Sequence, residues 1–458
     1  MNKYPLMSKL LVIGFLMVLL AIPLMMVRDL IAERSANRHD ATEEVARAHA
    51  GAQILTGPVI WLPYTETFVR TVKVDGAIGQ TREEMVTEDR VSIQFPKAQD
   101  TRSQLDTETR LRGIFPVTVY TSQHAGTGRF VWTEITPQHR GGQLTLGQPL
   151  LLMGVSDARG LLAAPQLRLA GSPLPVGQAP AGAPLPLAAR LDPARLQPGA
   201  TLDFDLKLDL AGTGRIGWVP LADENSVTLT SPWPHPNFTG DFLPRTRAIS
   251  ASGFEATWRV PSLSSQAQAQ FAQPGDKRSL EQFSVALEDP VDVYRLTERA
   301  TKYAMMFIML TFAAFFVLEM VKRWRIHPMQ YLMIGAAMVL FFLLLLSLSE
   351  HLDFAWAYLI ASAACITLLA HYLRHVLGGW RAGLGMSGLL VALYGVLYGI
   401  LVSEDNALMM GSLLLFGVLA AIMVATRKID WYGAMGPQLV TDREMHQPVQ
   451  PAPAQGAA

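Results

Sequence analysis

The chain has 458 residues, of which 50% are hydrophobic and 17% are charged, and its formal net charge is zero. The charged fraction is below the roughly 25% of ordinary soluble proteins. A neutral balance gives no electrostatic case for nucleic acid as a partner, because such binding requires a basic face. The only cysteine, Cys365, lies in an apolar run. The polar part of the chain therefore has no internal disulfide and no cysteine-based zinc or iron–sulfur site.

Six apolar runs are long enough to cross a bilayer as helices. A run of about 18 or more apolar residues matches the hydrocarbon core, which is ~30 Å thick. A long, mostly polar region separates the first run from the other five. We therefore expect an α+β membrane protein with a large water-exposed domain inserted between its first and second transmembrane helices. The predicted spans are 10–27, 303–320, 329–349, 354–373, 383–402 and 407–425.

The charged residues beside these spans predict the orientation of the chain. Short cytoplasmic loops collect Lys and Arg. Such cations precede the first span and follow the second, fourth and sixth, whereas the other two short loops contain acids and neither Lys nor Arg. We therefore expect residues 1–9 and 426–458 in the cytoplasm and residues 28–302 outside. The cations are Lys3, Lys9, Lys322, Arg323, Arg325, Arg374, Arg381, Arg427 and Lys428, and the acids are Glu350, Asp353, Glu404 and Asp405.

The first apolar run could instead be a cleaved signal peptide. Its length exceeds the 7–15 apolar residues of a signal core. It also ends in Met25-Met26-Val27-Arg28, without a cleavage site of the small-x-small type. An uncleaved anchor is therefore the favoured interpretation.

The outer region combines a helix with a β-rich domain. Residues 28–50 are polar and rich in Ala, Glu and Arg, which is typical of a helix continuing out of the membrane, and Gly57-Pro58 ends it. Further along, apolar and polar residues alternate with period two, most clearly over 201–210, as in an antiparallel sheet with one solvated face. Many short strands with Gly and Pro turns favour a sandwich-like domain. Residues 171–200, rich in Pro, Gly and Ala, are expected to form a long loop or a linker between two halves.

Seven stretches are longer and more unusual than generic membrane sequence. They are GVSDARG at 154–160, SPWPHPNFTGDFLP at 231–244, LTERATKY at 296–303, LTFAAFFV at 310–317, HPMQYL at 327–332, LSLSEH at 346–351 and TRKIDWY at 426–432. In this order they resemble the CreD family of bacterial inner-membrane, cell-envelope integrity proteins. The likeness covers nearly the whole chain apart from the Pro/Ala-rich tail, which is expected to be partly disordered.

The resemblance implies a multi-pass protein of the inner membrane of a Gram-negative bacterium. It implies six spans, cytoplasmic termini and a periplasmic domain. It also links the chain to the Cre two-component regulatory system and to envelope integrity. It carries over no catalytic residue, ligand or transported substrate.

Glu319 is an acidic residue inside the second predicted span, one residue from its inner end. An acid in lipid is a candidate functional group. Lys322 and Arg323 follow three and four residues later, which is the spacing of a local ion pair. We favour this structural pair, and a conducting or coupling role is the alternative.

Polar residues also mark the outer ends of two spans. Glu350 and His351 end the third span, and Arg299 and Lys302 precede the second. They are candidates for a polar collar that docks the β domain onto the membrane helices. Plain solvated charge at the membrane boundary explains them equally well.

The segment from Trp233 to Asp241 predicts a loop rich in aromatic residues and Pro. Such a loop could be an exposed recognition surface. It could equally be a rigid corner between strands that packs Trp233 and Phe238. His235 and Asp241 suggest acid–base chemistry, but no nucleophile stands in an activating arrangement with them.

These features favour a non-enzymatic inner-membrane protein that supports envelope integrity or a stress response, with a periplasmic β domain for sensing or binding. The alternative is a transporter or channel for an envelope-related solute. An enzyme is least favoured, because G-x-S-x-G, Walker and H-E-x-x-H motifs do not occur. The expected partners are the lipid bilayer and an envelope protein or cell-wall component. We expect no catalytic residue, cofactor, metal or nucleic acid, and the oligomeric state and ligand stay open.

Overall fold

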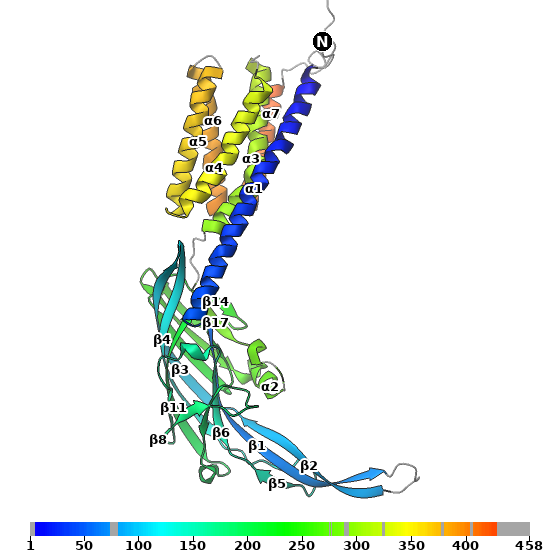
Figure 1. The fold of residues 1–458 in the computed structure, drawn as a ribbon, viewed down its shortest axis with the longest axis vertical. Helices are drawn as coiled ribbons and strands as arrows, with labels where there is room; N and C mark the ends of the chain where they lie inside the picture. Colours follow the sequence, from blue (N-terminus) through cyan, green and yellow to red (C-terminus); the bar gives the residue numbers. More distant parts are fainter. Residues whose placement is uncertain are drawn as a thin grey trace, which may run out of the picture. The chain divides into compact units, whose positions relative to one another are not determined.

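The computed structural model describes residues 5–73, 81–273, 275, 277–287, 293–322, 326–376, 380–403 and 406–427. The chain forms two compact units (Figure 1). The membrane unit contains Met1–Ser35 and Val291–Ala458, and the β unit contains Ala36–Pro290. Part of the orientation argument falls outside the described residues: Lys3, Arg323, Arg325, Glu404, Asp405, Lys428 and the rest of the tail.

The first helix, α1 (Pro5–Ala48), joins the first predicted span and the predicted helical extension in one element, with Pro23 inside it. Its buried residues in the membrane unit recur every three or four positions, which is the spacing of one helix face. The other side of the same stretch exposes large apolar residues. One stripe of α1 therefore packs against protein. The stripe consists of Ile13, Leu16, Leu20, Leu24, Val27 and Ile31.

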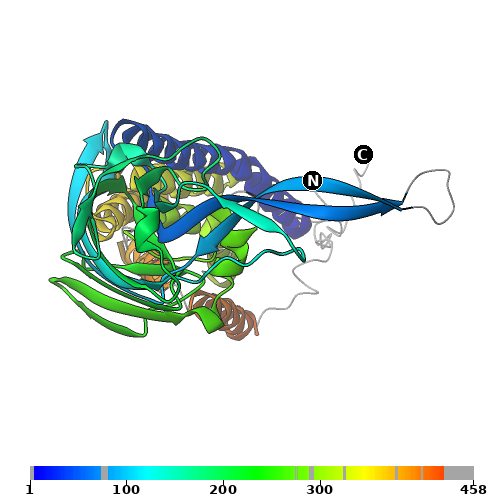
Figure 2. The same ribbon diagram turned by 90° about the horizontal axis from the view of Figure 1, so that it is seen from below.

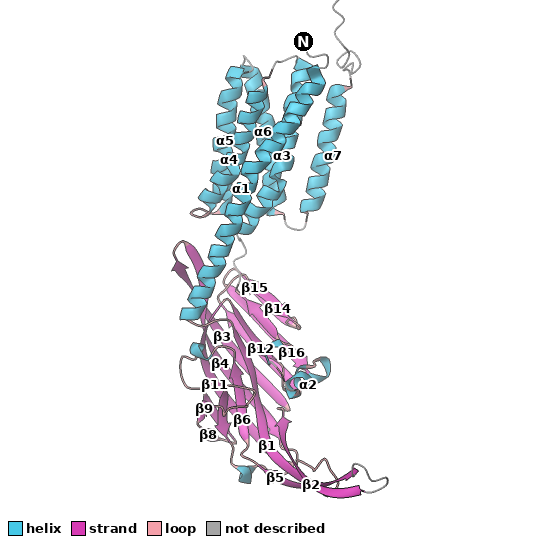
Figure 3. Ribbon diagram, turned by 45° about the vertical axis from the view of Figure 1, so that its right-hand side comes forward, coloured by secondary structure: helices cyan, strands magenta, loops and turns pink. Residues whose placement is uncertain are grey.

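Five further helices complete the membrane unit. They are α3 (Val293–Lys322), α4 (Pro328–Ser349), α5 (Phe354–Val376), α6 (Trp380–Val402) and α7 (Ala407–Thr426). Among the described residues, six helices with α1 included are long and apolar enough to cross a membrane. Figure 3 shows them running alongside one another. The structure thus confirms the six predicted spans as helices.

Two local features position these helices. α4 begins at a capping box, in which the His327 imidazole accepts the Met329 N–H and the Gln330 side chain accepts the His327 N–H at 3.0 Å. Pro328 occupies the first helical turn, where its missing N–H costs nothing. Farther along α4, a Cβ atom on Gly335 would lie 2.1 Å from Cδ1 of Leu20. The glycine therefore lets α1 approach α4 closely.

The β unit contains two sheets. Within the described residues, sheet A has nine strands and sheet B has eight. Sheet A follows the order β14 (Asn237–Gly240), β17 (Phe283–Ala286), β12 (Arg215–Val219), β1 (Gln53–Lys73), β6 (Leu150–Val155), β10 (Leu187–Arg190) and β9 (Val176–Gln178), while β2 (Thr81–Gln94) and β5 (Gln143–Leu146) also pair with β1.

Sheet B is formed by strands between Ala98 and Pro261. Its order is β15 (Thr246–Ser250), β16 (Gly253–Pro261), β13 (Glu224–Ser231), β3 (Ala98–Arg112), β4 (Phe115–Val131), β11 (Thr201–Thr213), β7 (Gln166–Leu169) and β8 (Ser172–Leu174). One short α-helix, α2 (Ala267–Ala272), and four 3₁₀ turns, at Ala158–Gly160, Pro193–Arg195, Ser262–Ser264 and Lys277–Ser279, complete the described part of this unit.

The two sheets pack face to face, as expected for a sandwich. Leu151 of sheet A shares a buried cluster with Phe204 and Leu210 of sheet B. Trp218 of sheet A shares another with Trp258 of sheet B. The alternation along β11 is confirmed, because Leu202, Phe204, Leu208 and Leu210 are buried while the intervening Asp203, Asp205, Lys207 and Asp209 are exposed.

Most pairings are antiparallel as expected, including both of those made by β11, but each sheet also contains one parallel pairing and is therefore mixed. β1 pairs with β12 in parallel, and β3 pairs with β13 in parallel. Parallel neighbours need a long crossover, and here both partners come from distant parts of the chain. A period of two reports which face of a strand is buried. It does not report the direction of the neighbouring strand.

The Pro-rich stretch 171–200 is not a linker. It contains three short strands, β8, β9 and β10, and a 3₁₀ turn. Leu187 and Ala189 of β10 lie in the core shared by both sheets. β8 and β9 are end strands of their sheets, where Pro is tolerated because one side of the strand makes no ladder bonds.

Beyond the sandwich, β1 and β2 continue as a two-stranded ribbon, which Figure 2 shows extending away from the rest of the β unit. Glu66 is fully buried near the base of this ribbon. It accepts the His139 N–H at 2.8 Å, and the Arg90 side chain lies within 3.4 Å. The His139 ring stacks on Phe68 at 3.5 Å. This charged cluster fixes the ribbon to the loop that follows β4.

Candidate functional site

The predicted loop around Trp233 is a corner between β13 and β14. The Trp233 indole N–H donates to the His235 carbonyl at 2.9 Å, and its backbone N–H donates to the Ser231 hydroxyl. Trp233 and Phe238 are partly buried against the Trp258 core. The structure therefore favours the rigid corner over an exposed recognition surface.

His235 and Asp241 serve separate parts of this corner. The His235 side chain is exposed. The Asp241 carboxylate accepts the Gln282 N–H at 2.9 Å, and the Asp241 N–H donates to the Gln282 carbonyl. These bonds attach the segment after β14 to the start of β17, so Asp241 has a structural role here.

The GVSDARG stretch is also structural. Its Asp157 carboxylate accepts the N–H of Gly51 at 3.0 Å and pairs with the Arg159 guanidinium. This pairing holds the pKa of the Asp157 carboxyl well below its usual range. Arg159 also donates to the carbonyl of Arg47, in the last turn of α1. The stretch therefore ties the end of α1 to the start of the β sandwich.

Glu319 does not pair with Lys322, so the predicted local pair is wrong for this residue and untested for Arg323. Its carboxylate instead binds the ammonium of Lys9, from α1, and accepts from the Tyr331 hydroxyl at 3.2 Å and from the Ile326 N–H. Lys322 is exposed, and Arg323 lies outside the described residues. The acid in the span thus joins α1, α3 and α4 at one end of the membrane unit.

The residues predicted to form a collar make contacts within the membrane unit. Glu350 lies 3.6 Å from the Arg34 guanidinium of α1 and accepts from the Tyr294 hydroxyl of α3. Arg299 donates to two carbonyls at the end of α6, those of Ile400 and Ser403. Lys302 pairs with Glu298 of its own helix, and His351 is exposed. The structure joins Glu350 to α1, and it does not bring the four residues into one cluster.

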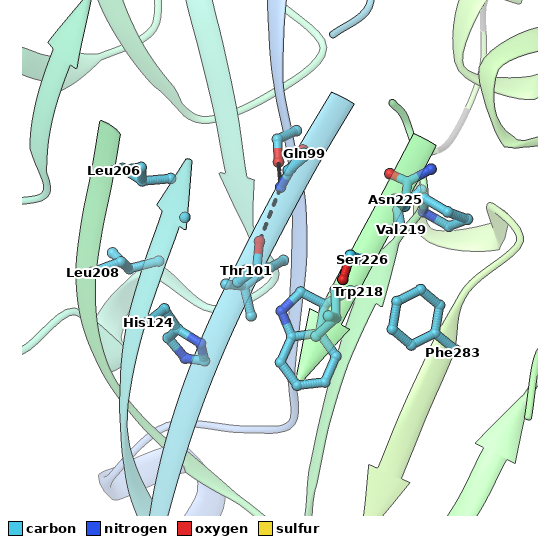
Figure 4. Close-up of a pocket in the computed structure, with 15 residues that line it drawn as sticks. Gln99, Thr101, His124, Leu206, Leu208, Trp218, Val219, Asn225, Ser226 and Phe283 are labelled. Atoms are coloured by element: carbon cyan, nitrogen blue, oxygen red, sulfur yellow. Dashed lines mark hydrogen bonds between the residues drawn. The ribbon is translucent and has the colours of Figure 1, made fainter. Parts of the chain in front are cut away.

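An enclosed cavity lies between the two sheets (Figure 4). His124 is bonded through both ring nitrogens, to the hydroxyls of Ser103 and Ser122, at 2.8 and 2.9 Å. The Trp218 indole N–H faces no hydrogen-bond partner although it is buried. The volume is only about 30 Å³, which is room for water and not for a metabolite. This cavity is therefore not the candidate site.

The candidate site is a groove on the outer face of sheet A, with a volume of about 1000 Å³. Its floor is formed by apolar residues of β1 and β2, and one wall is α2 with the segment that follows it. The opposite wall is the turn before β10. Figure 3 shows α2 beside the strands. The apolar lining includes Ile54, Trp61, Ile93, Leu185, Phe271 and Leu280.

Lys277 is the single charged residue among the lining residues that the structure describes. Its ammonium lies 5.1 Å from the Phe271 ring centre and donates to the carbonyls of Phe271 and Gln273. Burial lowers the pKa of Lys277. A large apolar pocket with a few polar groups and a perturbed titratable side chain is the usual form of a ligand site.

Sequence reasoning did not find this groove. Its residues come from β1, β2, the turn 182–186 and the segment 271–282, which are far apart along the chain. The one available signal was the cluster of Pro184 and Pro186 around Leu185, which was interpreted as part of a linker. Among the described residues, no three His, Cys, Asp or Glu side chains gather as metal ligands.

Comparison with known proteins identifies the family of the chain over nearly its whole length. Residues 5–432 match the family described as "Inner membrane protein CreD". The chain is 36% identical over 455 residues to the inner membrane protein CreD of Escherichia coli strain K12, covering 97% of this chain and 98% of that protein. The chain belongs to the CreD family. Membership and the six apolar helices together identify a multi-pass inner-membrane protein.

Partial structural similarity to a solved metallopeptidase adds no information about this CreD-family chain. An M1 zinc metallopeptidase from Deinococcus radiodurans aligns over 42% of both chains, with 10% identity and a TM-score of 0.20. So low a score supports no conclusion about fold or activity. The family match, by contrast, includes both units and the groove residues.

Proposed function

We propose that this protein is a non-enzymatic member of the CreD family that supports envelope integrity by binding an apolar ligand in the groove of its β unit. The observation that carries the proposal is the groove itself, which combines an apolar lining with one partly buried cation. Transfer of apolar groups from water into such a site is favourable by ~0.8 kcal/mol per methylene group. Ligand binding would then be signalled to partner proteins in the envelope.

The proposal places the β unit in the periplasm. Its support is the distribution of Lys and Arg in the short loops, which indicates cytoplasmic termini. An apolar groove facing that compartment suits a sensor of envelope components.

The polar residues of the membrane helices fit an anchoring role better than transport. Glu319 and Glu350 each bind a cation of α1, at Lys9 and Arg34. These pairs attach α1 to the other helices, which gives both acids a structural use.

An apolar photoprobe tests the groove. Adamantyl diazirine, applied to the full chain in nanodiscs, should label the half-buried groove residues Trp61 and Ile93 as well as helix residues that face lipid. Ala272→Trp places an indole over the groove and should abolish the groove labels only. The matched variant Ala125→Trp lies on the exposed face of sheet B and should leave all labels in place.

The label positions would be identified by mass spectrometry of peptides. Labelling of the helices serves as the internal control for probe delivery. If wild-type protein shows helix labels and no groove labels, the groove is not an apolar binding site and the proposal fails.

A further inference from the structure

We propose that the groove holds a single long acyl chain whose anionic head group is bound by Lys277. This inference rests on the proposed function, because it names the class of ligand for the same site. Three properties of the groove lead to it: the few hydrogen-bonding groups of its walls, the placement of the one charged side chain among its described lining residues, and the fully paired backbone of β1 on its floor.

The walls offer few hydrogen bonds to a ligand. Pro184 and Pro186 have no N–H, and the N–H of Ala183 donates to the Pro180 carbonyl at 3.1 Å. On the opposite wall, the carbonyls of Phe271 and Gln273 accept from Lys277. A peptide lying here would leave its own N–H and C=O groups unsatisfied, which is costly.

The β1 part of the floor is closed to strand addition. β1 is paired on one side with β12 and on the other with β6 along Leu55 and Thr56. The N–H of Ile54 donates to the Ser156 hydroxyl at 2.9 Å. An occupant lying over this part of β1 therefore touches side chains and no free backbone edge, whereas β2 pairs only with β1 among the described strands. An acyl chain requires no hydrogen bonds along its length.

Lys277 supplies the contact for a head group. An ammonium has three protons, and two of them are used by the carbonyls of Phe271 and Gln273. The remaining proton can be donated to a carboxylate or phosphate oxygen. Because burial disfavours the charge of Lys277, an anion beside it is stabilising. Both a fatty acid and an anionic phospholipid present this chemistry.

The test uses the full chain in phosphatidylcholine nanodiscs with two photoreactive probes of equal length, palmitate and hexadecanol. Both should form saturable adducts on the groove walls. Lys277→Gln should weaken the apparent affinity for palmitate by about tenfold, as expected for loss of a charge-assisted hydrogen bond. It should reduce hexadecanol labelling far less than palmitate labelling, and this difference separates the head-group contact from any change in the wall that Lys277 holds through the Phe271 and Gln273 carbonyls.

Two control variants accompany this change. Lys277→Arg keeps the charge and should keep most of the palmitate affinity. Lys207→Gln makes the same substitution on the exposed face of β11 and should have no effect. Phosphatidylglycerol nanodiscs then separate the two sources: competition with palmitate assigns the site to a lipid of the bilayer, and lack of competition assigns it to the free acid.

Two results would overturn the inference. Equal palmitate binding by the wild type and Lys277→Gln would rule out the head-group contact. Failure of both probes, with adamantyl diazirine still labelling the groove, would exclude an acyl chain while the proposed function survives. Loss of the adamantyl label as well would refute both proposals.

Discussion

His124 shows how burial sets the chemistry of a single side chain. Both of its ring nitrogens bond to serine hydroxyls inside the sandwich, and burial lowers its pKa from 6.5 to about 3. The imidazole is therefore neutral in the folded protein over the whole physiological range. In an unfolded chain the same group would bind a proton near pH 6.5.

This difference predicts a loss of stability in acid. Between pH 6.5 and pH 3 the unfolded chain binds a proton at His124 that the folded chain does not. The free energy of unfolding therefore decreases as the pH is lowered. The expected loss from this residue is ~2 kcal/mol between pH 7.5 and pH 5. Urea unfolding of the full chain, followed by tryptophan fluorescence at each pH, measures it.

His124→Gln is the control for this prediction, because glutamine cannot titrate in this range. The variant should show a shallower pH dependence than the wild type. Identical slopes would mean that His124 can take up a proton while folded.

At the scale of elements, α1 is held to the other helices of the membrane unit by ion pairs near both ends of its membrane portion. Lys9 binds Glu319 of α3, and Arg34 lies beside Glu350 at the end of α4. Between them the stripe from Ile13 to Ile31 packs on protein. Packing provides most of the contact, and the ion pairs fix the register of α1 along its neighbours.

Removal of one partner of an ion pair should therefore lower the stability of the protein. Glu319→Gln leaves the Lys9 ammonium partly buried without its counter-charge, with an expected destabilisation of ~3 kcal/mol. Thermal denaturation in detergent measures the effect. Adding Lys9→Gln should restore part of the stability, because the unpaired charge is removed.

Lys322→Gln is the matched control at the end of the same helix. Lys322 is exposed, and surface changes of this type usually fall within about 0.5 kcal/mol. A larger loss of thermal stability in Lys322→Gln than in Glu319→Gln would instead support the local pair that the sequence spacing suggested.

For the whole molecule, the central prediction is the side of the membrane on which the β unit lies. Cys365 is the single cysteine of the sequence and is buried. The natural chain should therefore react little with a maleimide. Ser250→Cys, in the exposed strand β15, should react with a membrane-impermeant maleimide in intact spheroplasts. Lys322→Cys, at the end of α3, should react only after permeabilisation.

Cys365→Ala in both variants removes residual labelling. The labelled fraction of each variant is read from a gel-shift assay with and without permeabilisation. Reaction of Lys322→Cys in intact spheroplasts, with protection of Ser250→Cys, would reverse the orientation and remove the basis for a periplasmic ligand.

The fold could be predicted from the sequence where a pattern is local. The six spans follow from the length of apolar runs, and the inner face of β11 follows from alternation, because each reports the burial of a residue relative to its near neighbours. Strand order and the two parallel pairings were not visible, because no local pattern carries them.

The candidate site could not be predicted from the sequence, because local patterns do not show which distant residues come together. Sequence spacing offered Lys322 as the partner of Glu319, whereas the actual partner, Lys9, is 310 residues away. His235 and Asp241 were suggestive as neighbours in sequence, but their roles are separate. The groove joins Trp61, Leu185 and Phe271 only after the chain has folded.

The sequence by itself therefore determined the class of this protein: apolar runs of bilayer length, an intervening alternating region, and motifs shared with the CreD family. These features depend on the length of apolar runs and on local periodicity, which determine directly which residues contact water and which contact lipid. The tertiary structure alone decided which residues meet. Contacts between distant segments, such as Lys9 with Glu319 and the walls of the groove around Lys277, arise from the packing of many elements at once, and no short stretch of sequence encodes them.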